Sequence, residues 1–266
     1  MHRRHLLVAS ASAAVLSATS PSYGQPVPVR AARSFVLVHG SWHGAWCWDR
    51  TAQQLRMRGH RVYAVTQTGL GDRQHLLGAA NHIDVYVNDI VNLIEAEELD
   101  DVVLVGHSFG GIPVTGAAAR LSGRISSLVY LDAGVPRSGE SALSPLSPEE
   151  QALRRKAVVP LAGVDVLMPP SEIPRFWGLN ASDSEWVKRR LTPHPFATYA
   201  TPLRFDDAAW ERLPRTYVQC TAPWHPALGA MQARLREDRK WRWIEFAAGH
   251  DGMVTHPQEL AEILAS

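Results

Sequence analysis

The fold of this chain follows from the stretch Asp101–Gly111, which reads D-V-V-L-V-G-H-S-F-G-G. Its first part, Val102–Val105, is an unbroken β-branched and aliphatic run, which is typical of a strand buried on both faces of a sheet. The pattern G-x-S-x-G follows at once in Gly106–Gly110, and Ile112–Leu121 after it is mostly small and aliphatic, as suits a helix packed closely on a sheet. Strand, sharp turn and helix are the context in which this pattern predicts a nucleophilic serine, here Ser108.

The turn predicts a strained backbone conformation at Ser108, with Gly106 and Gly110 leaving room for a crossing chain. The hydroxyl group of Ser108 then stands clear at the carboxyl end of the strand. The backbone N–H of Phe109 points at whatever Ser108 attacks, so it is the first predicted donor of an oxyanion hole. The alternative interpretation is a glycine-rich strand-to-helix turn that contains a serine by chance.

Length and charge limit the classes of function. The chain has 266 residues, 45% of them hydrophobic and 20% charged, and a formal net charge of +1. This length suits one α/β domain with a large core. The net charge close to zero gives no electrostatic reason to expect a nucleic acid or an anionic membrane as a partner. We therefore expect a small-molecule substrate and no nucleic acid. The sequence does not indicate an oligomeric state.

The amino terminus has the layout of an export signal. Met1–Arg4 is basic, Leu6–Leu16 is apolar with small residues, and Ser20–Gln25 is polar and turn-prone. The apolar part is too short to span a membrane as a stable helix. The sequence thus predicts a cleaved signal peptide at residues 1–24, a periplasmic or secreted protein, and no membrane insertion after cleavage. A disordered or anchoring tail is the alternative.

The chain has two cysteines, Cys47 and Cys220, and export would permit a disulfide. The expected topology places Cys220 near the end of a strand that lies well across the sheet from the strand preceding Cys47. Neighbouring strands lie about 4.8 Å apart, whereas the Cα atoms of a disulfide lie within about 7 Å. Neither cysteine has a C-x-x-C or zinc-site spacing. We expect two buried thiols.

Buried strands and amphipathic helices alternate along the chain, which predicts right-handed crossovers and a mostly parallel sheet. The predicted strands are Ser34–His39, Val62–Thr66, Val102–Val105, Ser127–Asp132, Thr216–Cys220 and Trp241–Phe246. The predicted helices are Trp46–Arg58, Ile83–Glu98, Ile112–Leu121, Ala227–Arg236 and Pro257–Leu264.

The alternation stops in the proline-rich segment from about 135 to 207, which predicts a lid or small cap inserted into the domain. Its expected helices are Gln151–Val158 and Ser182–Leu191, the second with Ser182 as its N-cap. Aromatic residues of this cap insertion either hold it in place or line an apolar pocket. They are Phe176, Trp177, Trp186, Phe196 and Tyr199.

A serine hydroxyl needs an adjacent base to act as a nucleophile at neutral pH. His250 is the candidate among 12 histidines, because it lies in the loop leaving the last strand, at the edge where Ser108 emerges. The backbone N–H of Ser41, after the first strand, is the second predicted oxyanion donor. His39 and His43 lie near the site and are expected to structure their loop.

Four motifs carry a resemblance to a known family. They are F-V-L-V-H-G-S-W-H-G-A-W-C-W at 35–48, G-H-S-F-G-G at 106–111, the strand at 128–132, and G-H-D-G-M-V-T-H-P-Q-E-L at 249–260. Together they resemble the α/β-hydrolase superfamily, in the branch of plant methyl-ester esterases and hydroxynitrile lyases. Bacterial pyrethroid-hydrolase-like esterases belong to the same branch. The resemblance covers nearly all of 34–264 and is weakest in the cap insertion.

The resemblance implies an α/β-hydrolase fold over residues 25–266: a mostly parallel six-stranded sheet, helices on both faces, and a cap after the strand that follows the nucleophile helix. It implies Ser108 as nucleophile, His250 as base, and the N–H groups of Ser41 and Phe109 as the oxyanion hole. The residues themselves show no metal-site spacing and no dinucleotide fingerprint, so we expect no cofactor and no metal. Gly69-Leu70-Gly71 lacks the third glycine of a dinucleotide fingerprint.

The sequence departs from this family at two positions. Where the lyases have a cyanide-stabilising lysine after the catalytic histidine, this chain has Asp251, whose carboxylate would repel cyanide. The plant enzymes carry the triad acid just after the strand that corresponds to Thr216–Cys220. This chain has no carboxylate in 220–225.

Another carboxylate must therefore orient the histidine and stabilise its imidazolium. We predict Asp132, which ends the strand after the nucleophile helix at the same edge of the sheet. Some α/β-hydrolases place their acid there. Rivals are Asp206 and Asp207 at the end of the cap insertion, and Asp251, which is close to the histidine in sequence. Asp132 would otherwise only terminate its strand in a turn.

These residues predict a serine hydrolase that cleaves small apolar or aromatic carboxylic esters through an acyl-enzyme. The alternative is a catalytically idle homologue that keeps the fold and binds a ligand, an option raised by the missing acid after Thr216–Cys220. A hydroxynitrile lyase is a further alternative, against which Asp251 argues.

Overall fold

The structure is a computed structural model that describes residues 32–266. The predicted signal peptide at residues 1–24 lies outside the described residues, so export stays a prediction. No helix between residues 32 and 266 combines the length and apolarity needed to cross a bilayer.

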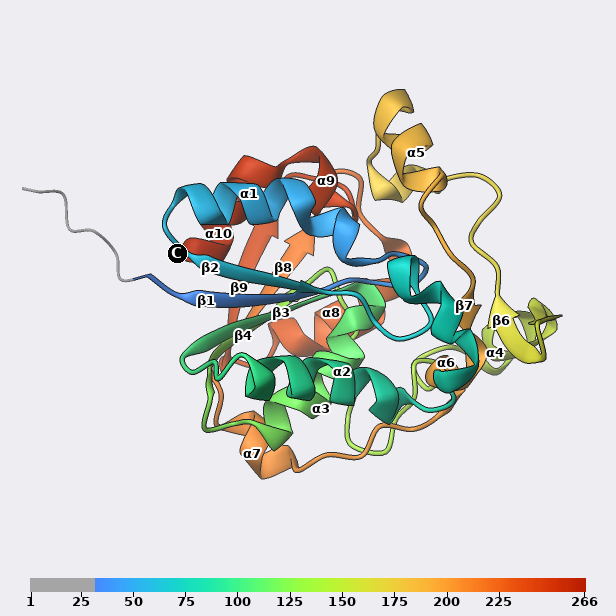
Figure 1. Ribbon diagram of the computed structural model, residues 1–266, viewed down its shortest axis with the longest axis horizontal. Coiled ribbons are helices and arrows are strands. Elements are labelled where there is room, and N and C mark those ends of the chain that lie inside the picture. Colours follow the sequence, from blue (N-terminus) through green and yellow to red (C-terminus); the bar gives the residue numbers. More distant parts are fainter. Residues whose placement is uncertain (1–31) are drawn as a thin grey trace, which may run out of the picture. The chain divides into compact units, whose positions relative to one another are not determined.

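A six-stranded sheet forms the centre of the fold, with strand order β2-β1-β3-β4-β8-β9 and every neighbouring pair parallel (Figure 1). Each strand lies within one or two residues of its predicted bounds, so the predicted mostly parallel sheet is confirmed. The strands are β1 (Ser34–Val38), β2 (Arg61–Val65), β3 (Val102–His107), β4 (Ile125–Leu131), β8 (Arg215–Cys220) and β9 (Trp241–Phe246).

Helices cover both faces of the sheet and bury two separate apolar cores (Figure 1). One face packs against α1 (Asp49–Met57), α9 (Gly252–Thr255) and α10 (Pro257–Ala265), the other against α2 (Ile83–Ala96), α3 (Gly111–Arg120) and α8 (Gly229–Arg236). Successive side chains of a strand point to opposite faces. On β3, Val102 and Leu104 therefore enter one core, and Val103 and Val105 enter the other.

The predicted helices start differently in two places. A 3₁₀ turn, Ala45–Trp48, precedes α1, and another, Pro226–Leu228, precedes α8. Such turns are common at helix termini, where the first backbone N–H groups lack intrahelical partners. The spacing of apolar residues indicates which face of a helix is buried. It does not indicate whether the first turn of the helix is a 3₁₀ turn or an α turn.

The cap insertion lies between β4 and β8, at the carboxyl edge of the sheet (Figure 1). It contains a three-stranded antiparallel sheet that the sequence did not predict, since its strands are short and β5 contains a proline. Its elements are α4 (Pro148–Lys156), β5 (Val158–Leu161), β6 (Val164–Leu167), α5 (Ala181–Lys188), β7 (His194–Pro195) and α6 (Phe196–Ala200), and the short α7 (Asp207–Glu211) follows.

Both predicted helices of the insertion start earlier than expected. Ser182 is not the N-cap of α5, so that prediction was wrong. The side chain of Asn180 accepts a hydrogen bond from the backbone N–H of Asp183 at 2.8 Å and begins the helix there. Helix α4 starts at Pro148, because Ser147 and Glu150 form a reciprocal capping box.

The two cysteines are free thiols and both are buried. Cys47 follows β1 and Cys220 ends β8, and β3 and β4 lie between these strands in the sheet. Because of this separation across the sheet, the two thiols stay unpaired, as the sequence predicts.

Candidate active site

The backbone at Ser108 has the strained conformation that the sequence predicts, with φ of 54°. A side chain at either flanking glycine would collide with the backbone. A Cβ atom on Gly106 would lie 2.8 Å from the carbonyl oxygen of Gly110, and one on Gly110 would lie 2.5 Å from the carbonyl oxygen of His39. The two glycines therefore allow the turn that lifts Ser108 out of the end of β3.

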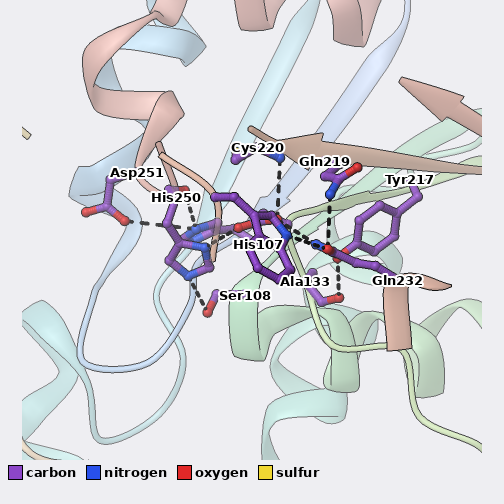
Figure 2. Close-up of polar contacts among 11 residues, drawn as sticks. His107, Ser108, Ala133, Tyr217, Gln219, Cys220, Gln232, His250 and Asp251 are labelled. Carbon is purple, nitrogen blue, oxygen red and sulfur yellow. Dashed lines mark hydrogen bonds and ion pairs between the residues drawn. The ribbon is translucent and has the colours of Figure 1, made fainter. Parts of the chain in front are cut away.

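His250 lies in the loop between β9 and α9 and faces Ser108 (Figure 2). Its Nε2 atom is 2.9 Å from Ser108 Oγ, which donates its proton to that nitrogen. The nucleophile turn also holds this loop, because His107 Nε2 donates to the carbonyl oxygen of His250 at 2.9 Å. On the other side, the N–H of His250 donates to the carbonyl of Phe176 in the cap insertion at 2.9 Å. Sequence reasoning missed this role of His107.

Asp132 faces the other nitrogen of His250. His250 Nδ1 donates to Asp132 Oδ2 at 2.7 Å, which is within hydrogen-bond reach for a triad acid. Because a carboxylate can only accept, this contact places the proton on Nδ1 and leaves Nε2 free to accept from Ser108. Asp132 is fully buried and has a φ of 42°, where β4 ends. The structure thus brings Ser108, His250 and Asp132 into one hydrogen-bonded line.

Gln232 holds the second carboxylate oxygen of Asp132, and no local sequence pattern indicates this role. Its Nε2 atom donates to Asp132 Oδ1 at 3.1 Å, and the backbone N–H of Cys220 lies 3.4 Å from the same oxygen. The amide of Gln232 is itself oriented, because its Oε1 atom accepts from Trp224 Nε1 at 2.9 Å and Gln219 Nε2 at 3.1 Å. The loop after β8, which lacks an acid, therefore supports the acid on β4 through Gln232.

The rival carboxylates have other partners. Asp206 is exposed and accepts from the backbone N–H of Ala209 as the N-cap of α7, and Asp207 lies exposed in the first turn of that helix. Asp251 is fully buried, but its Oδ2 atom faces His43 Nε2 at 3.3 Å rather than the ring of His250.

His43 and Asp251 form a buried pair that orders the loop after β1. His43 Nδ1 donates to the carbonyl oxygen of Ser41 at 2.7 Å, so both ring nitrogens face acceptors. Burial alone would lower the pKa of His43, but the charge of Asp251 and its hydrogen bond outweigh burial and raise it. His39 donates to the carbonyl of Gly40 at 2.8 Å and accepts from the N–H of Gln67 at 3.1 Å. Both histidines structure the loop, as predicted.

Two neutral imidazoles surround His250. The ring of His107 lies 4.6 Å from that of His250, and the ring of His225 lies 4.8 Å away. Burial lowers the pKa of both, that of His225 to about 3, and the proximity of His250 adds to the effect. At neutral pH neither ring adds a positive charge beside an imidazolium at His250.

The predicted oxyanion donors lie beside the nucleophile. A Cβ atom on Gly40 would be 3.3 Å from Ser108 Oγ, so the chain that leads into Ser41 passes directly by the hydroxyl. Ser41 and Phe109 line the same cavity as Ser108. The hydroxyl groups of Ser41 and Tyr199 are hydrogen-bonded to each other, and the ring of Tyr199 packs on Phe109 with centroids 4.6 Å apart.

A cavity of about 380 Å³ opens above Ser108, between the sheet edge and the cap insertion. Among the predicted aromatic residues only Tyr199 lines it; Phe176 stacks on His225 and packs near His250, and Trp177 is buried in a core. Most of the cavity wall is apolar, and it includes Ile112, Val135, Pro136, Ala142, Leu143, Pro145, Leu146, Ala227, Leu228, Ala230 and Met231. In the described part of the chain, no group of three or more histidine, cysteine or carboxylate side chains could hold a metal ion.

Known proteins are similar to this chain over almost all of its described residues. The family model described as "Alpha/beta hydrolase family" matches residues 35–263. The carbendazim hydrolyzing esterase of Nocardioides sp. is 42% identical over 240 residues, which cover 88% of this chain and 98% of that protein. Methylesterase 10 of Arabidopsis thaliana is 40% identical over 103 residues, 38% of each chain.

The fold is shared with solved structures. An extracellular alpha/beta-hydrolase from a Paenibacillus species, described as homologous to tobacco salicylic acid binding protein 2, superposes with a TM-score of 0.70. It is 23% identical and the match covers 87% of this chain and 97% of that one. The pyrethroid hydrolase PytH superposes with a TM-score of 0.67 at 19% identity, covering 88% of this chain and 97% of that one. At these identities the likeness concerns the fold alone.

Proposed function

Because this chain belongs to the alpha/beta hydrolase family, we propose that its Ser108, His250 and Asp132 form the catalytic triad of a serine esterase. One observation carries the proposal: the unbroken line of hydrogen bonds from Ser108 Oγ through both ring nitrogens of His250 to Asp132. This is the arrangement by which a weak hydroxyl nucleophile is activated at neutral pH.

In the first half of the reaction, Ser108 Oγ attacks the ester carbonyl and its proton passes to His250 Nε2. Asp132 stabilises the imidazolium, and the N–H groups of Ser41 and Phe109 bind the oxyanion. Collapse of the tetrahedral intermediate transfers the proton to the leaving alcohol and leaves an acyl-enzyme. Water then attacks the acyl carbonyl while His250 Nε2 takes its proton. Collapse of the second tetrahedral intermediate returns that proton to Ser108 Oγ and releases the carboxylic acid.

The paired histidine argues against the catalytically idle alternative. A protein that only binds a ligand has no use for an oriented imidazole, yet Asp132 is held from its far side by Gln232. The apolar wall of the cavity favours small apolar or aromatic esters as substrates. The name of the Nocardioides relative makes carbendazim a compound to include among the esters tested.

A fluorophosphonate probe tests whether Ser108 is activated. We expect the probe to label the full-length protein at Ser108, because only a serine with an adjacent base attacks the phosphorus atom of the probe at a useful rate. The labelled residue is identified by peptide mass spectrometry, and the heat-denatured protein is the control. A folded protein that hydrolyses none of a panel of methyl, aryl and 4-nitrophenyl esters and takes up no label would favour the idle alternative.

We also expect no hydroxynitrile lyase activity. At the position where the lyases have lysine, Asp251 is fully buried and pairs with His43. A carboxylate at this position would repel cyanide instead of stabilising it, and this carboxylate is already committed to its pair with His43. The measurement is the release of cyanide from mandelonitrile. A rate clearly above that of the buffer, abolished when Ser108 is blocked by the probe, would contradict this prediction.

A further inference from the structure

Three arginines line the cavity above Ser108 together with one carboxylate. Arg137 follows β4, Arg154 lies on α4 and Arg234 lies on α8, and Glu140 is the acidic residue. The third histidine of the active site, His225, also lines the cavity and is neutral, because burial lowers its pKa to about 3. The cavity proposed to bind the ester thus carries more positive than negative charge.

None of these three guanidinium groups forms an ion pair with a carboxylate in residues 32–266. Elsewhere in the same range, other arginines do pair with acidic side chains. These are Arg50, Arg58, Arg73, Arg120, Arg124 and Arg236. The three guanidinium groups that line the cavity have no carboxylate partner of their own in the part of the chain that the structure describes, so a charged ligand can reach them there.

Arg137 and Arg234 lie near each other at one side of the cavity. Arg234 Nη2 donates to the carbonyl oxygen of Val135 at 3.0 Å, which anchors its guanidinium beside the segment that leads to Arg137. Partial burial lowers the pKa of Arg234, the like charge of Arg137 lowers it further, and the opposite charge of Glu140 raises it. The carboxylate of Glu140 accepts from the backbone N–H of Arg137 at 2.8 Å and forms no ion pair with either guanidinium in residues 32–266, so it offsets only part of their positive charge. The two guanidinium groups repel each other, and an anion between them would relieve that repulsion.

Arg154 brings a third positive charge close to the reacting groups from the cap insertion. Burial raises the pKa of Tyr199, and the charge of Arg154 opposes that rise. Burial lowers the pKa of His225, and the charge of Arg154 adds to that fall. Arg137 and Arg154 are exposed and Arg234 is half-buried, whereas Ile112, Val135 and Leu143 of the apolar wall are buried. The positive groups thus lie on the solvent side of an apolar chamber.

We propose that this enzyme prefers esters with an apolar body and a carboxylate at the end remote from the scissile carbonyl, the carboxylate being bound by Arg137 and Arg234. Guanidinium groups bind carboxylates through paired, charge-assisted hydrogen bonds. The monoester of a dicarboxylic acid has this form, and its hydrolysis would release a dicarboxylate. This proposal rests on the proposed esterase function and names its substrate class.

Two rigid methyl esters that differ at one group test the proposal. Monomethyl terephthalate carries a carboxylate opposite the ester, and methyl 4-methylbenzoate carries a neutral methyl group there. We expect the full-length protein, or its mature form, to hydrolyse the anionic ester with a kcat/KM about tenfold higher than the neutral one. The preference should shrink when salt is raised to about 1 M, where the screening length is about 3 Å.

The variants Arg137→Gln and Arg234→Gln should each reduce the ratio of the two kcat/KM values several-fold, mainly through a higher KM for the anionic ester. Arg155→Gln is the matched control: Arg155 lies next to Arg154 on α4 but packs over the ring of Phe196, outside the cavity. It should leave the ratio unchanged. Equal hydrolysis of the two esters, or a ratio that survives both cavity variants, would overturn the charge preference alone. Hydrolysis of neither ester by a protein that still turns over 4-nitrophenyl esters would also overturn the charge preference alone. Hydrolysis of neither ester, together with no 4-nitrophenyl turnover and no probe label at Ser108, would overturn the esterase function with it.

Discussion

Replacing Ser108 with alanine is expected to lower kcat/KM for ester hydrolysis by at least about a thousandfold, a loss of about 4 kcal/mol of transition-state stabilisation. The change removes the atom that attacks the carbonyl. It leaves the oxyanion donors in place, because the backbone N–H groups of Ser41 and Phe109 do not depend on the side chain at 108. The measurement is the initial rate with a 4-nitrophenyl ester, under conditions in which trace wild-type enzyme would be detected.

The same variant separates loss of chemistry from loss of fold. The positive φ of Ser108 strains alanine and serine alike, so Ser108→Ala should unfold at nearly the temperature of the parent. Ser126, half-buried on β4 and away from the active site, donates its hydroxyl proton to the carbonyl of Val102 and offers a matched Ser→Ala control. Retained turnover in the Ser108 variant would show that another group is the nucleophile.

Replacing Asp132 with asparagine is expected to lower turnover by up to about 10⁴-fold, or about 5.5 kcal/mol. The carboxylate accepts the Nδ1 proton of His250 at 2.7 Å and so keeps Nε2 ready to take the proton of Ser108. An asparagine amide can instead donate to Nδ1, which moves the ring proton to Nε2. The histidine then cannot act as a base, and its imidazolium has lost its partner. Turnover and the melting temperature are measured on the same preparation.

Asp206→Asn and Asp207→Asn are the controls for this experiment. Both residues lie at the start of α7, exposed, and asparagine is as good an N-cap as aspartate. Each control should keep turnover close to that of the parent. If Asp132→Asn were active to within about tenfold of the parent, Asp132 would be a buried strand-terminating residue, and the base would need a different partner.

The strands and the turn at Ser108 could be predicted because their signals are local. A parallel strand that is buried on both faces must be apolar on both, so β1, β3 and the second half of β4 stand out as aliphatic or aromatic runs. β8 and β9 mix apolar with polar residues and were found by their place in the alternation of strands and helices. The turn at Ser108 needs small residues on both sides for steric reasons that a short pattern records, and a Cβ atom at Gly106 or Gly110 would collide with backbone. Such constraints act within a few residues and are legible without the rest of the molecule.

The cap insertion was harder to predict for a related reason. Its strands are two to four residues long, and β5 to β7 form a sheet through pairings that the chain makes only after it has turned back on itself. Runs this short carry too little periodicity to separate a strand from a turn. The predicted start of α5 was wrong, because Asn180 and Ser182 have similar N-cap propensities. Only the geometry of the preceding turn determines which of the two caps the helix.

The sequence by itself determined the fold class, the turn that carries the proposed nucleophile Ser108, and the loop that brings His250 to it. Each of these depends on strand order and on a short motif at a strand end. Asp132 required one further step, the inference that parallel strands bring their carboxyl ends to the same edge of the sheet.

Only the tertiary structure decided which side chains support and surround that site. Gln232 reaches Asp132 from a helix 100 residues away in sequence, and His107 holds the loop of His250 from 143 residues away. The arginines of the cavity come from a loop, the cap insertion and α8. Nothing in a local pattern records these contacts, because a side chain on a helix or loop acquires its partners only when the crossovers have packed both faces of the sheet.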